Sequence, residues 1–148
     1  MSWLINIING PNLNLLGQRE PELYGEKTLM DVEKSCLETA KDYNIKINFF
    51  QSNAEHDLIN WIHTSREKAS GIIINPAAFS HTSIAILDAL TLFEGPIIEV
   101  HISNIHKREN FRHHSYVSQK ANAVIAGFGV DGYNIAIRKM AYFCSQFK

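Results

Sequence analysis

The sequence predicts an α/β protein in which one parallel sheet lies between two layers of helices. Three observations predict this class. Short apolar runs alternate along the chain with amphipathic segments that have helical periodicity. Most of these runs are continuously apolar, as is typical of strands buried on both faces of a parallel sheet. Breaks with Gly, Pro or Asn separate the runs from the segments that follow, so each strand is expected to cross over through a helix.

Five segments have the character of strands. The first ends in Asn-Gly-Pro, and the second alternates apolar and polar positions as a half-buried edge strand would. The third and the last are expected to be buried, and the fourth is apolar apart from Glu99. The five predicted strands are Trp3–Asn9, Ile45–Gln51, Gly71–Asn75, Ile97–His101 and Ala121–Ala126. For this number of parallel strands the flavodoxin-like order 2-1-3-4-5 is the natural choice.

Helices are expected between these strands. Thr28 and Asp31 resemble a capping box, with Asp in place of the usual Glu. The helix that they begin has an apolar stripe made of Leu29, Val32, Cys36, Leu37 and Ala40. Ser52-Asn53 is expected to cap a second helix, which carries Leu58, Ile59 and Ile62. The remaining two predicted helices are Ile84–Phe93 and Gly132–Phe147.

Length and composition favour a single domain over residues 1–148, in a cytoplasmic protein. A formal net charge of −1 gives no electrostatic reason to expect nucleic acid or a membrane surface as a partner. No apolar run approaches the roughly 20 residues that span a bilayer, and the N-terminus resembles a strand rather than a leader. Cys36 and Cys144 lack CxxC spacing, so we expect two reduced, packed thiols.

Familiar ligand-binding motifs have little support. Gly127–Gly132 fits GxGxxG, but too little chain follows it for a strand with a ribose-binding acid, so its glycines are expected to shape a tight turn. No GxxxxGK[ST] occurs. Seven histidines without HExxH spacing or a neighbouring cysteine specify no zinc site. None of these patterns therefore predicts a dinucleotide, a P-loop nucleotide or a zinc ion.

Polar residues instead gather where the predicted strands end. In the order 2-1-3-4-5 the strand order reverses between strands 1 and 3, and ligands bind at such a point. Asn9–Asn12 and Asn75–His81 emerge there, although Asn also suits turns and strand ends. A long loop, Gly10–Lys27, precedes the first helix, and loops of that length in small domains are usually functional or mobile.

Some residues have a clearer functional signal than others. Glu99 and His101 alternate with apolar residues in a strand expected to be buried, so their polar groups need partners. Asp88 falls on an apolar helix stripe, where a carboxylate is either paired across an interface or part of a site. Arg19 and Tyr24 lie in the long loop, where such side chains are more often solvated than catalytic.

Several long motifs resemble those of the type II 3-dehydroquinate dehydratases. They are INGPNLNLLGxREPxxYG at Ile8–Gly25, QSNxE at Gln51–Glu55, INPAAFSHTS at Ile74–Ser83, EVHISN at Glu99–Asn104, RExFRH at Arg108–His113 and GFGxxGY at Gly127–Tyr133. The resemblance extends from the first strand to the last helix, with no departure at a functional position. The fold of that family is flavodoxin-like, in agreement with the pattern of strands and helices.

The resemblance implies a lyase that dehydrates 3-dehydroquinate to 3-dehydroshikimate by anti elimination through an enolate, without cofactor. The enzyme would serve the shikimate pathway of aromatic amino acid biosynthesis or quinate catabolism. Tyr24 would be the base, made a phenolate by the cation of Arg19 as the loop closes. His101 would be the acid, oriented by Glu99, and Asn12 would hold a water on the enolate oxygen.

The same resemblance implies the substrate contacts and the assembly. Asn75 and the backbone N–H groups of Ile102 and Ser103 would bind the substrate carboxylate. His81 and Arg112 would bind its ring hydroxyls. Asp88 would reach the active site of a neighbouring subunit in a homododecamer built from trimers.

Two other classes of flavodoxin-like protein remain alternatives. A phosphate- or nucleotide-binding module would need a Ser/Thr-rich loop after the first strand. A signalling receiver would need acidic residues after the first strand and a phosphoacceptor Asp after the third. Those places hold Asn9–Asn12 and Asn75, so neither class is favoured.

Overall fold

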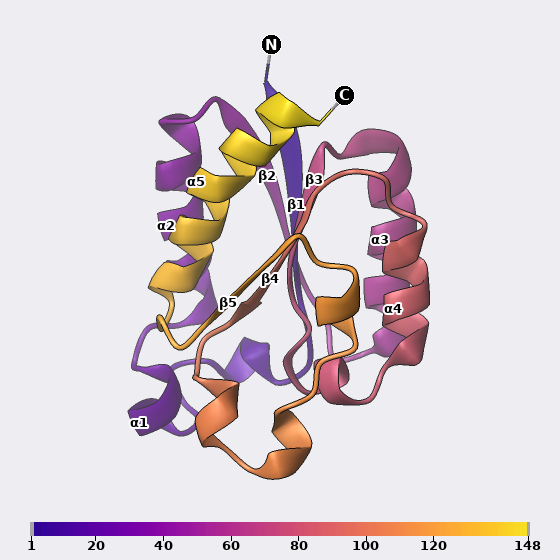
Figure 1. Cartoon of the computed structure of the whole chain (residues 1–148). Helices are drawn as coiled ribbons and strands as arrows, with labels where there is room; N and C mark the ends of the chain where they lie inside the picture. Colours follow the sequence, from indigo (N-terminus) through magenta and orange to yellow (C-terminus); the bar gives the residue numbers. More distant parts are fainter. Residues whose placement is uncertain (1, 148) are drawn as a thin grey trace.

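The computed structural model describes residues 2–147 and contains the predicted parallel sheet, in the strand order β2-β1-β3-β4-β5. The strands are β1 (Trp3–Asn9), β2 (Ile45–Gln51), β3 (Gly71–Asn75), β4 (Ile97–His101) and β5 (Ala123–Ala126). Helices lie on both faces of this sheet (Figure 1). The flavodoxin-like architecture predicted from the sequence is confirmed.

Each face of the sheet is covered by a pair of helices. The helices are α1 (Pro21–Tyr24), α2 (Leu29–Lys41), α3 (Glu55–Lys68), α4 (Ile84–Thr91) and α5 (Asp131–Gln146). Helices α2 and α5 cover one face, and α3 and α4 cover the other, with α1 apart from both pairs (Figure 1).

Successive residues of the central strands enter different cores. Ile7 and Ile73 pack with the α2 and α5 side chains, whereas Ile8, Ile72 and Ile74 pack with those of α3 and α4. Both cores need apolar residues, which explains why these strands have continuous apolar runs. The burial of both faces also sets the register of the sheet, because a shift by one residue would exchange the two cores.

The predicted N-cap of α2 is confirmed, and the predicted N-cap of α3 is not. The Thr28 hydroxyl accepts from the Asp31 N–H and the Asp31 carboxylate accepts from the Thr28 N–H, which forms the predicted capping box. The predicted Ser52-Asn53 cap is wrong, because the N-cap of α3 is Ala54. Ser52 accepts from the Ala54 N–H and donates to Asp57, so it braces the turn before the helix.

The last strand also differs from the prediction. It begins at Ala123 and is only partly buried, with Val124 47% exposed. The reason is that β5 lies at the edge of the sheet, where among the described residues it pairs with β4 alone. One face of β5 is therefore incompletely covered. The glycines that follow have the predicted turn role, since Gly127 and Gly129 both have positive φ.

Irregular loops with short 3-10 helices gather at the carboxyl ends of the strands, at the bottom of Figure 1. The long loop after β1 contains the 3-10 helix Leu13–Leu15 and then α1. The loop between β4 and β5 contains three further 3-10 helices, Ile105–Lys107, Asn110–Arg112 and Val117–Gln119. No helix within residues 2–147 is long and apolar enough to cross a membrane.

Candidate active site

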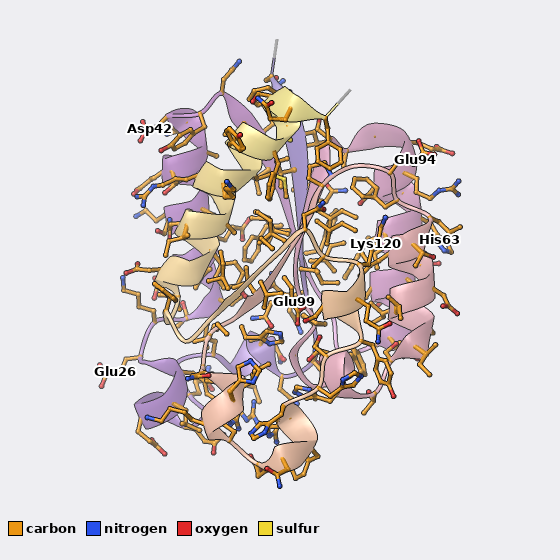
Figure 2. The ribbon with its side chains drawn as sticks, viewed as in Figure 1. Glu26, Asp42, His63, Glu94, Glu99 and Lys120 are labelled. Atoms are coloured by element: carbon orange, nitrogen blue, oxygen red, sulfur yellow. The ribbon has the colours of Figure 1, made fainter. Side chains whose placement is uncertain are left out.

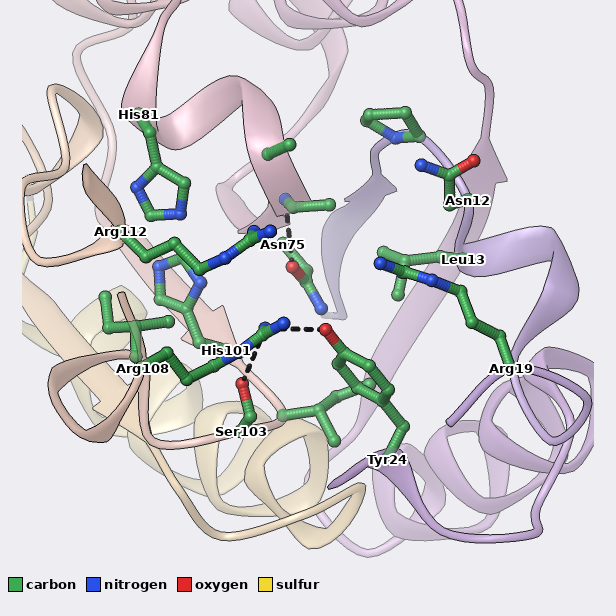
Figure 3. Close-up of a pocket in the computed structure, with 15 residues that line it drawn as sticks. Asn12, Leu13, Arg19, Tyr24, Asn75, His81, His101, Ser103, Arg108 and Arg112 are labelled. Atoms are coloured by element: carbon green, nitrogen blue, oxygen red, sulfur yellow. Dashed lines mark hydrogen bonds between the residues drawn. The ribbon is translucent and has the colours of Figure 1, made fainter. Parts of the chain in front are cut away.

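A cavity of about 180 Å³, which we call the rim pocket, lies where β1, β3 and β4 end (Figure 3). It is enclosed by the loop after β1, the 3-10 helix Ala77–His81 and the loop after β4. Nine of the predicted site residues line it, namely Asn12, Arg19, Tyr24, Asn75, His81, His101, Ile102, Ser103 and Arg112. Glu99 lies behind the pocket wall, and Asp88 lies outside the pocket. Most of the residues singled out in the sequence therefore lie together around one cavity at this edge of the sheet.

The carboxylate that binds His101 lies buried behind the rim pocket. Glu99 and His101 are two residues apart on β4, so their side chains share a face, and the Glu99 carboxylate is hydrogen-bonded to His101 Nε2. Ser115 and Ser118 donate to the same carboxylate, which is completely buried. Figure 2 shows Glu99 near the middle of the molecule, in contrast to the peripheral Asp42 and Glu94.

These contacts determine the charge of Glu99. Burial by itself raises the pKa of the Glu99 carboxyl, but the hydrogen bond and charge of His101, with the bonds from Ser118 and Ser115, outweigh it. The pKa therefore lies below its ordinary value and Glu99 is a carboxylate at neutral pH. Because that carboxylate takes Nε2 of His101, Nδ1 is the ring nitrogen left for a ligand.

The Tyr24 hydroxyl is bonded to a different cation from the one expected from the sequence. Arg108 Nη1 donates to the Tyr24 hydroxyl over 2.6 Å and to Ser103 Oγ over 3.4 Å (Figure 3). The expected cation, Arg19, instead lies with its guanidinium carbon 5.3 Å from the Tyr24 ring centre and pairs with Glu20. The only sequence signal for Arg108 was its place at the start of the RExFRH motif.

The loop after β1 and the loop after β3 approach each other closely. A Cβ atom on Gly10 would lie 2.4 Å from the Pro76 carbonyl oxygen, so only glycine fits there. Asn12 has a φ of 69°, a left-handed conformation that Asn tolerates, and its N–H donates to Asn53. The sequence allowed Asn12 to be either a turn residue or a site residue. In the structure it is in a turn and also lines the pocket.

His81 presents a defined ring nitrogen to the pocket. Its Nδ1 lies 2.8 Å from the His114 carbonyl oxygen, which only accepts, so Nδ1 carries the proton. Burial lowers the pKa of His81 below its ordinary value, despite that hydrogen bond. Neutral His81 therefore offers Nε2 as an acceptor. The His81 and His101 rings lie 6.5 Å apart on one side of the pocket.

Two hydrogen bonds on the side away from the pocket hold the Asn75 amide. Its Oδ1 accepts from the Ala77 N–H and its Nδ2 donates to the hydroxyl of Tyr133, a buried residue of α5. Asn9 is not in a turn but at the buried end of β1, where its Oδ1 accepts from the same hydroxyl. Sequence reasoning did not connect Tyr133 to this site, because 58 residues separate it from Asn75.

Asp88 differs from its predicted surroundings. The sequence placed it on a stripe facing a packed surface, but within residues 2–147 its side chain is exposed on α4. Ile84 and Leu92, near the ends of the same helix, are 54% and 52% exposed. The reason is that α4 buries a different face, through Ile86 and Leu90. This outer face of α4 is therefore apolar and carries one carboxylate.

Comparison with known proteins gives consistent matches. The sequence profile of the family described as dehydroquinase class II matches residues 3–141. The chain is 59% identical over 145 residues to a 3-dehydroquinate dehydratase of Cereibacter sphaeroides, which covers 98% of this chain and 99% of that protein. It is 62% identical over 143 residues to 3-dehydroquinate dehydratase 2 of Agrobacterium fabrum, with 97% of each chain covered.

Solved structures agree with these sequence matches. The type II dehydroquinase of Propionibacterium acnes superposes with a TM-score of 0.93 at 44% identity, covering 96% of this chain and 98% of that one. The type II dehydroquinase of Butyrivibrio crossotus gives a TM-score of 0.91 at 41% identity, covering 94% and 97%. The similarity in fold therefore extends over nearly the whole of each chain.

Proposed function

The chain belongs to the class II dehydroquinase family, and we propose that its rim pocket carries out the dehydration of 3-dehydroquinate to 3-dehydroshikimate. Membership at this level of similarity makes the chain a carbon–oxygen lyase acting on 3-dehydroquinate. One observation carries the assignment of the pocket: a phenol bound by a guanidinium shares a small cavity with a histidine that is bound to a buried carboxylate.

Tyr24 is the base in this proposal. A phenol is ordinarily protonated at neutral pH, so it acts as a base only where its anion is stabilised. The Arg108 hydrogen bond supports this role, because a guanidinium donor favours the phenolate over the phenol. The phenolate removes the proton from the carbon beside the substrate ketone, and the electron pair of that C–H bond moves into an enolate.

His101 is the acid that completes the elimination. When the enolate collapses, its electrons form the new C=C bond and the C–O bond of the departing hydroxyl breaks. The imidazolium of His101 gives that oxygen a proton, and water leaves. The buried Glu99 carboxylate supports the role, because its charge stabilises imidazolium and its hydrogen bond orients the ring. Net transfer of the proton from Tyr24 back to His101 resets the site.

The remaining pocket residues hold the substrate. Asn12 positions a water on the enolate oxygen, as in an oxyanion hole. Asn75 and the backbone N–H groups of Ile102 and Ser103 bind the carboxylate. His81 and Arg112 bind ring hydroxyls, and the free Nε2 of His81 supports an accepting role.

Closure of the loop after β1 completes the site. Arg19 and Tyr24 both lie on this loop, and Arg19 pairs with the adjacent Glu20 rather than with the phenol oxygen. We propose that substrate binding draws the loop inward, so that Arg19 adds its charge and water is excluded.

The proposed assembly is a dodecamer of trimers in which Asp88 enters the pocket of the adjacent subunit. The exposed apolar residues Ile84 and Leu92 flank Asp88 on α4 and support an interface there. A carboxylate brought to a neighbouring pocket would face its arginines.

An absorbance assay tests the proposed function. Purified protein is mixed with 3-dehydroquinate, and the conjugated enone of the product is followed in the ultraviolet. We expect turnover without added metal or cofactor, and unchanged rates after treatment with a chelator. Absence of the enone signal with folded protein would refute the proposal.

A further inference from the structure

Behind Asn75 lies a chain of buried hydrogen bonds that ends on Tyr133. Tyr133 is completely buried on α5, and its hydroxyl lies 2.6 Å from Asn9 Oδ1 and 2.9 Å from Asn75 Nδ2. It ends the GFGxxGY motif, for which the sequence predicted a turn and a resemblance to the family but no role for Tyr133. The hydroxyl therefore joins the ends of β1 and β3 beneath the rim pocket.

The direction of every bond in this chain is determined. Asn9 Nδ2 donates to the Phe50 carbonyl oxygen, so Asn9 must present Oδ1 to the tyrosine. The single hydroxyl proton of Tyr133 is used on that oxygen. Its oxygen then accepts from Asn75, which must turn its NH₂ group toward Tyr133. At the far end the Ala77 N–H donates to Asn75 Oδ1, which agrees with that orientation.

This orientation determines what Asn75 offers to a ligand. An amide NH₂ has two protons, and Tyr133 uses one of them. The other proton has no hydrogen-bond partner among residues 2–147, and Asn75 lines the rim pocket. If the amide were rotated by half a turn, its oxygen would replace the NH₂ group and would repel an anion.

The small size of Gly132 allows Tyr133 to reach this depth. A Cβ atom on Gly132 would lie only 3.3 Å from Ile125 Cγ2 and 3.4 Å from Val100 Cγ1, so α5 begins in tight contact with the sheet. An added Cβ atom would require the Ile125 side chain to give way by a few tenths of an ångström. Tyr133 is the next residue, so it enters the core from this close approach.

We propose that Tyr133 is a positioning residue, which orients the Asn75 amide so that an N–H points at the substrate carboxylate. The proposal rests on the proposed function, in which Asn75 binds that carboxylate. Tyr133 does not touch substrate, because it is buried beneath Asn75. Its hydroxyl should therefore matter for ligands with a carboxylate and not for the same ligands without the charge.

The test is Tyr133→Phe, which keeps the ring and removes the hydroxyl. Affinities for 3-dehydroshikimate and for its methyl ester are measured by calorimetry, and KM and kcat with 3-dehydroquinate. We expect the variant to bind the acid about tenfold more weakly, the size expected for one hydrogen bond to a charged group. Binding of the ester should be unchanged, and KM should rise more than kcat falls.

Ser65→Ala is the matched control. Ser65 is also completely buried and accepts a hydrogen bond from a β1 residue, Asn6, but it lies away from the pocket. It should lower thermal stability without changing KM. If Tyr133→Phe fails to fold, Asn9→Ala provides the second variant, since it frees the hydroxyl proton and should weaken binding of the acid alone.

The outcomes separate the two claims. If Tyr133→Phe weakens binding of the acid and the ester equally, or weakens neither, then the positioning role is wrong. Normal turnover by the wild-type protein would still support the proposed function. In an Asn75→Ala background, Tyr133→Phe should cause no further loss of affinity for the acid, and a full additional loss would also overturn the role. Failure of wild-type protein to dehydrate 3-dehydroquinate would instead overturn the proposed function.

Discussion

Arg108 Nη1 lies 2.6 Å from the phenol oxygen of Tyr24, although 84 residues separate them in the chain. Arg108 comes from the loop after β4 and Tyr24 from the loop after β1, which meet over the rim pocket. Arg19 approaches the ring and not the oxygen. The proposed base therefore has a charged hydrogen-bond donor in this arrangement of the loops, and a second cation lies nearby.

Tyr24→Phe should abolish most turnover and leave binding intact. The change removes the proton acceptor, and a positioned general base contributes roughly 10²–10⁴-fold to rate. We expect kcat to fall within that range, while the calorimetric affinity for 3-dehydroquinate stays within about threefold, because the ring still packs in the loop. Tyr142→Phe, on the exposed side of α5, is the control and should retain full activity. A variant with near-normal kcat would show that another group is the base.

Arg108→Ala should reduce kcat more than Arg19→Ala does when both are assayed at neutral pH. Within residues 2–147 only Arg108 bonds the phenol oxygen directly, so its loss removes the donor that favours the phenolate. We expect a loss of about 10²-fold, consistent with about 3 kcal/mol for a bond to a charged group. Arg108→Lys should recover part of it. Lys107→Ala, at the neighbouring exposed position, serves as control. Equal losses in the two arginine variants would contradict this ranking.

His101→Ala should block release of the hydroxyl without blocking proton abstraction. In an elimination through an enolate, Tyr24 still removes the proton when the acid is missing. We therefore expect His101→Ala to exchange the substrate proton with solvent deuterium, as seen by NMR, although enone formation falls roughly 10²–10⁴-fold. Tyr24→Phe should lose exchange and turnover together. Loss of exchange in His101→Ala, or unchanged enone formation, would contradict the assignment of the acid.

Ser118→Ala should destabilise the protein at neutral pH but not in acid. The folded-state pKa of Glu99 is lowered, so the stabilisation from its carboxylate is present above the pKa of the unfolded chain. It is lost as the pH falls through the lower folded value. Because Ser118 donates to that carboxylate, its removal should cost about 1.5 kcal/mol at pH 7. Below the folded pKa the cost should approach zero.

Urea unfolding at a series of pH values measures this dependence. Ser65→Ala is the control. In the described part of the chain the Ser65 hydroxyl bonds only neutral groups, Asn6 and the Trp61 carbonyl, so the cost of removing it should not follow the Glu99 titration. An equal cost for Ser118→Ala at both ends of the pH range would mean that its bond does not depend on the charge of Glu99.

Subunit complementation tests whether Asp88 acts in a neighbouring pocket. Asp88→Ala and Tyr24→Phe should each have little activity as pure assemblies. In mixed assemblies, a pocket with an intact Tyr24 can receive Asp88 from a Tyr24→Phe neighbour, so about a quarter of pockets (half times half) should recover. Sedimentation establishes the assembly in each sample. A fully active monomer, or the absence of any recovery in mixed assemblies, would refute the shared site.

The sequence by itself determined the layers, the strand order and the edge of the sheet at which the rim pocket lies. It did so because burial on two faces imposes continuous apolar runs, as in Gly71–Asn75, and because parallel strands need helical crossovers. Interactions between residues close together in the sequence were also predictable from their spacing. The capping box of Thr28 and Asp31 is one example, and the shared strand face of Glu99 and His101 is another.

Only the tertiary structure decided which distant groups meet. Arg108 reaches Tyr24 through two irregular loops, and Tyr133 reaches Asn9 and Asn75 from the last helix. Periodicity describes which face of a regular element is buried, but it contains no information on where an irregular loop places a side chain. The exposure of Asp88 has a different reason. Helix α4 is apolar on nearly every side, so periodicity did not identify the face that packs against α3 and the sheet.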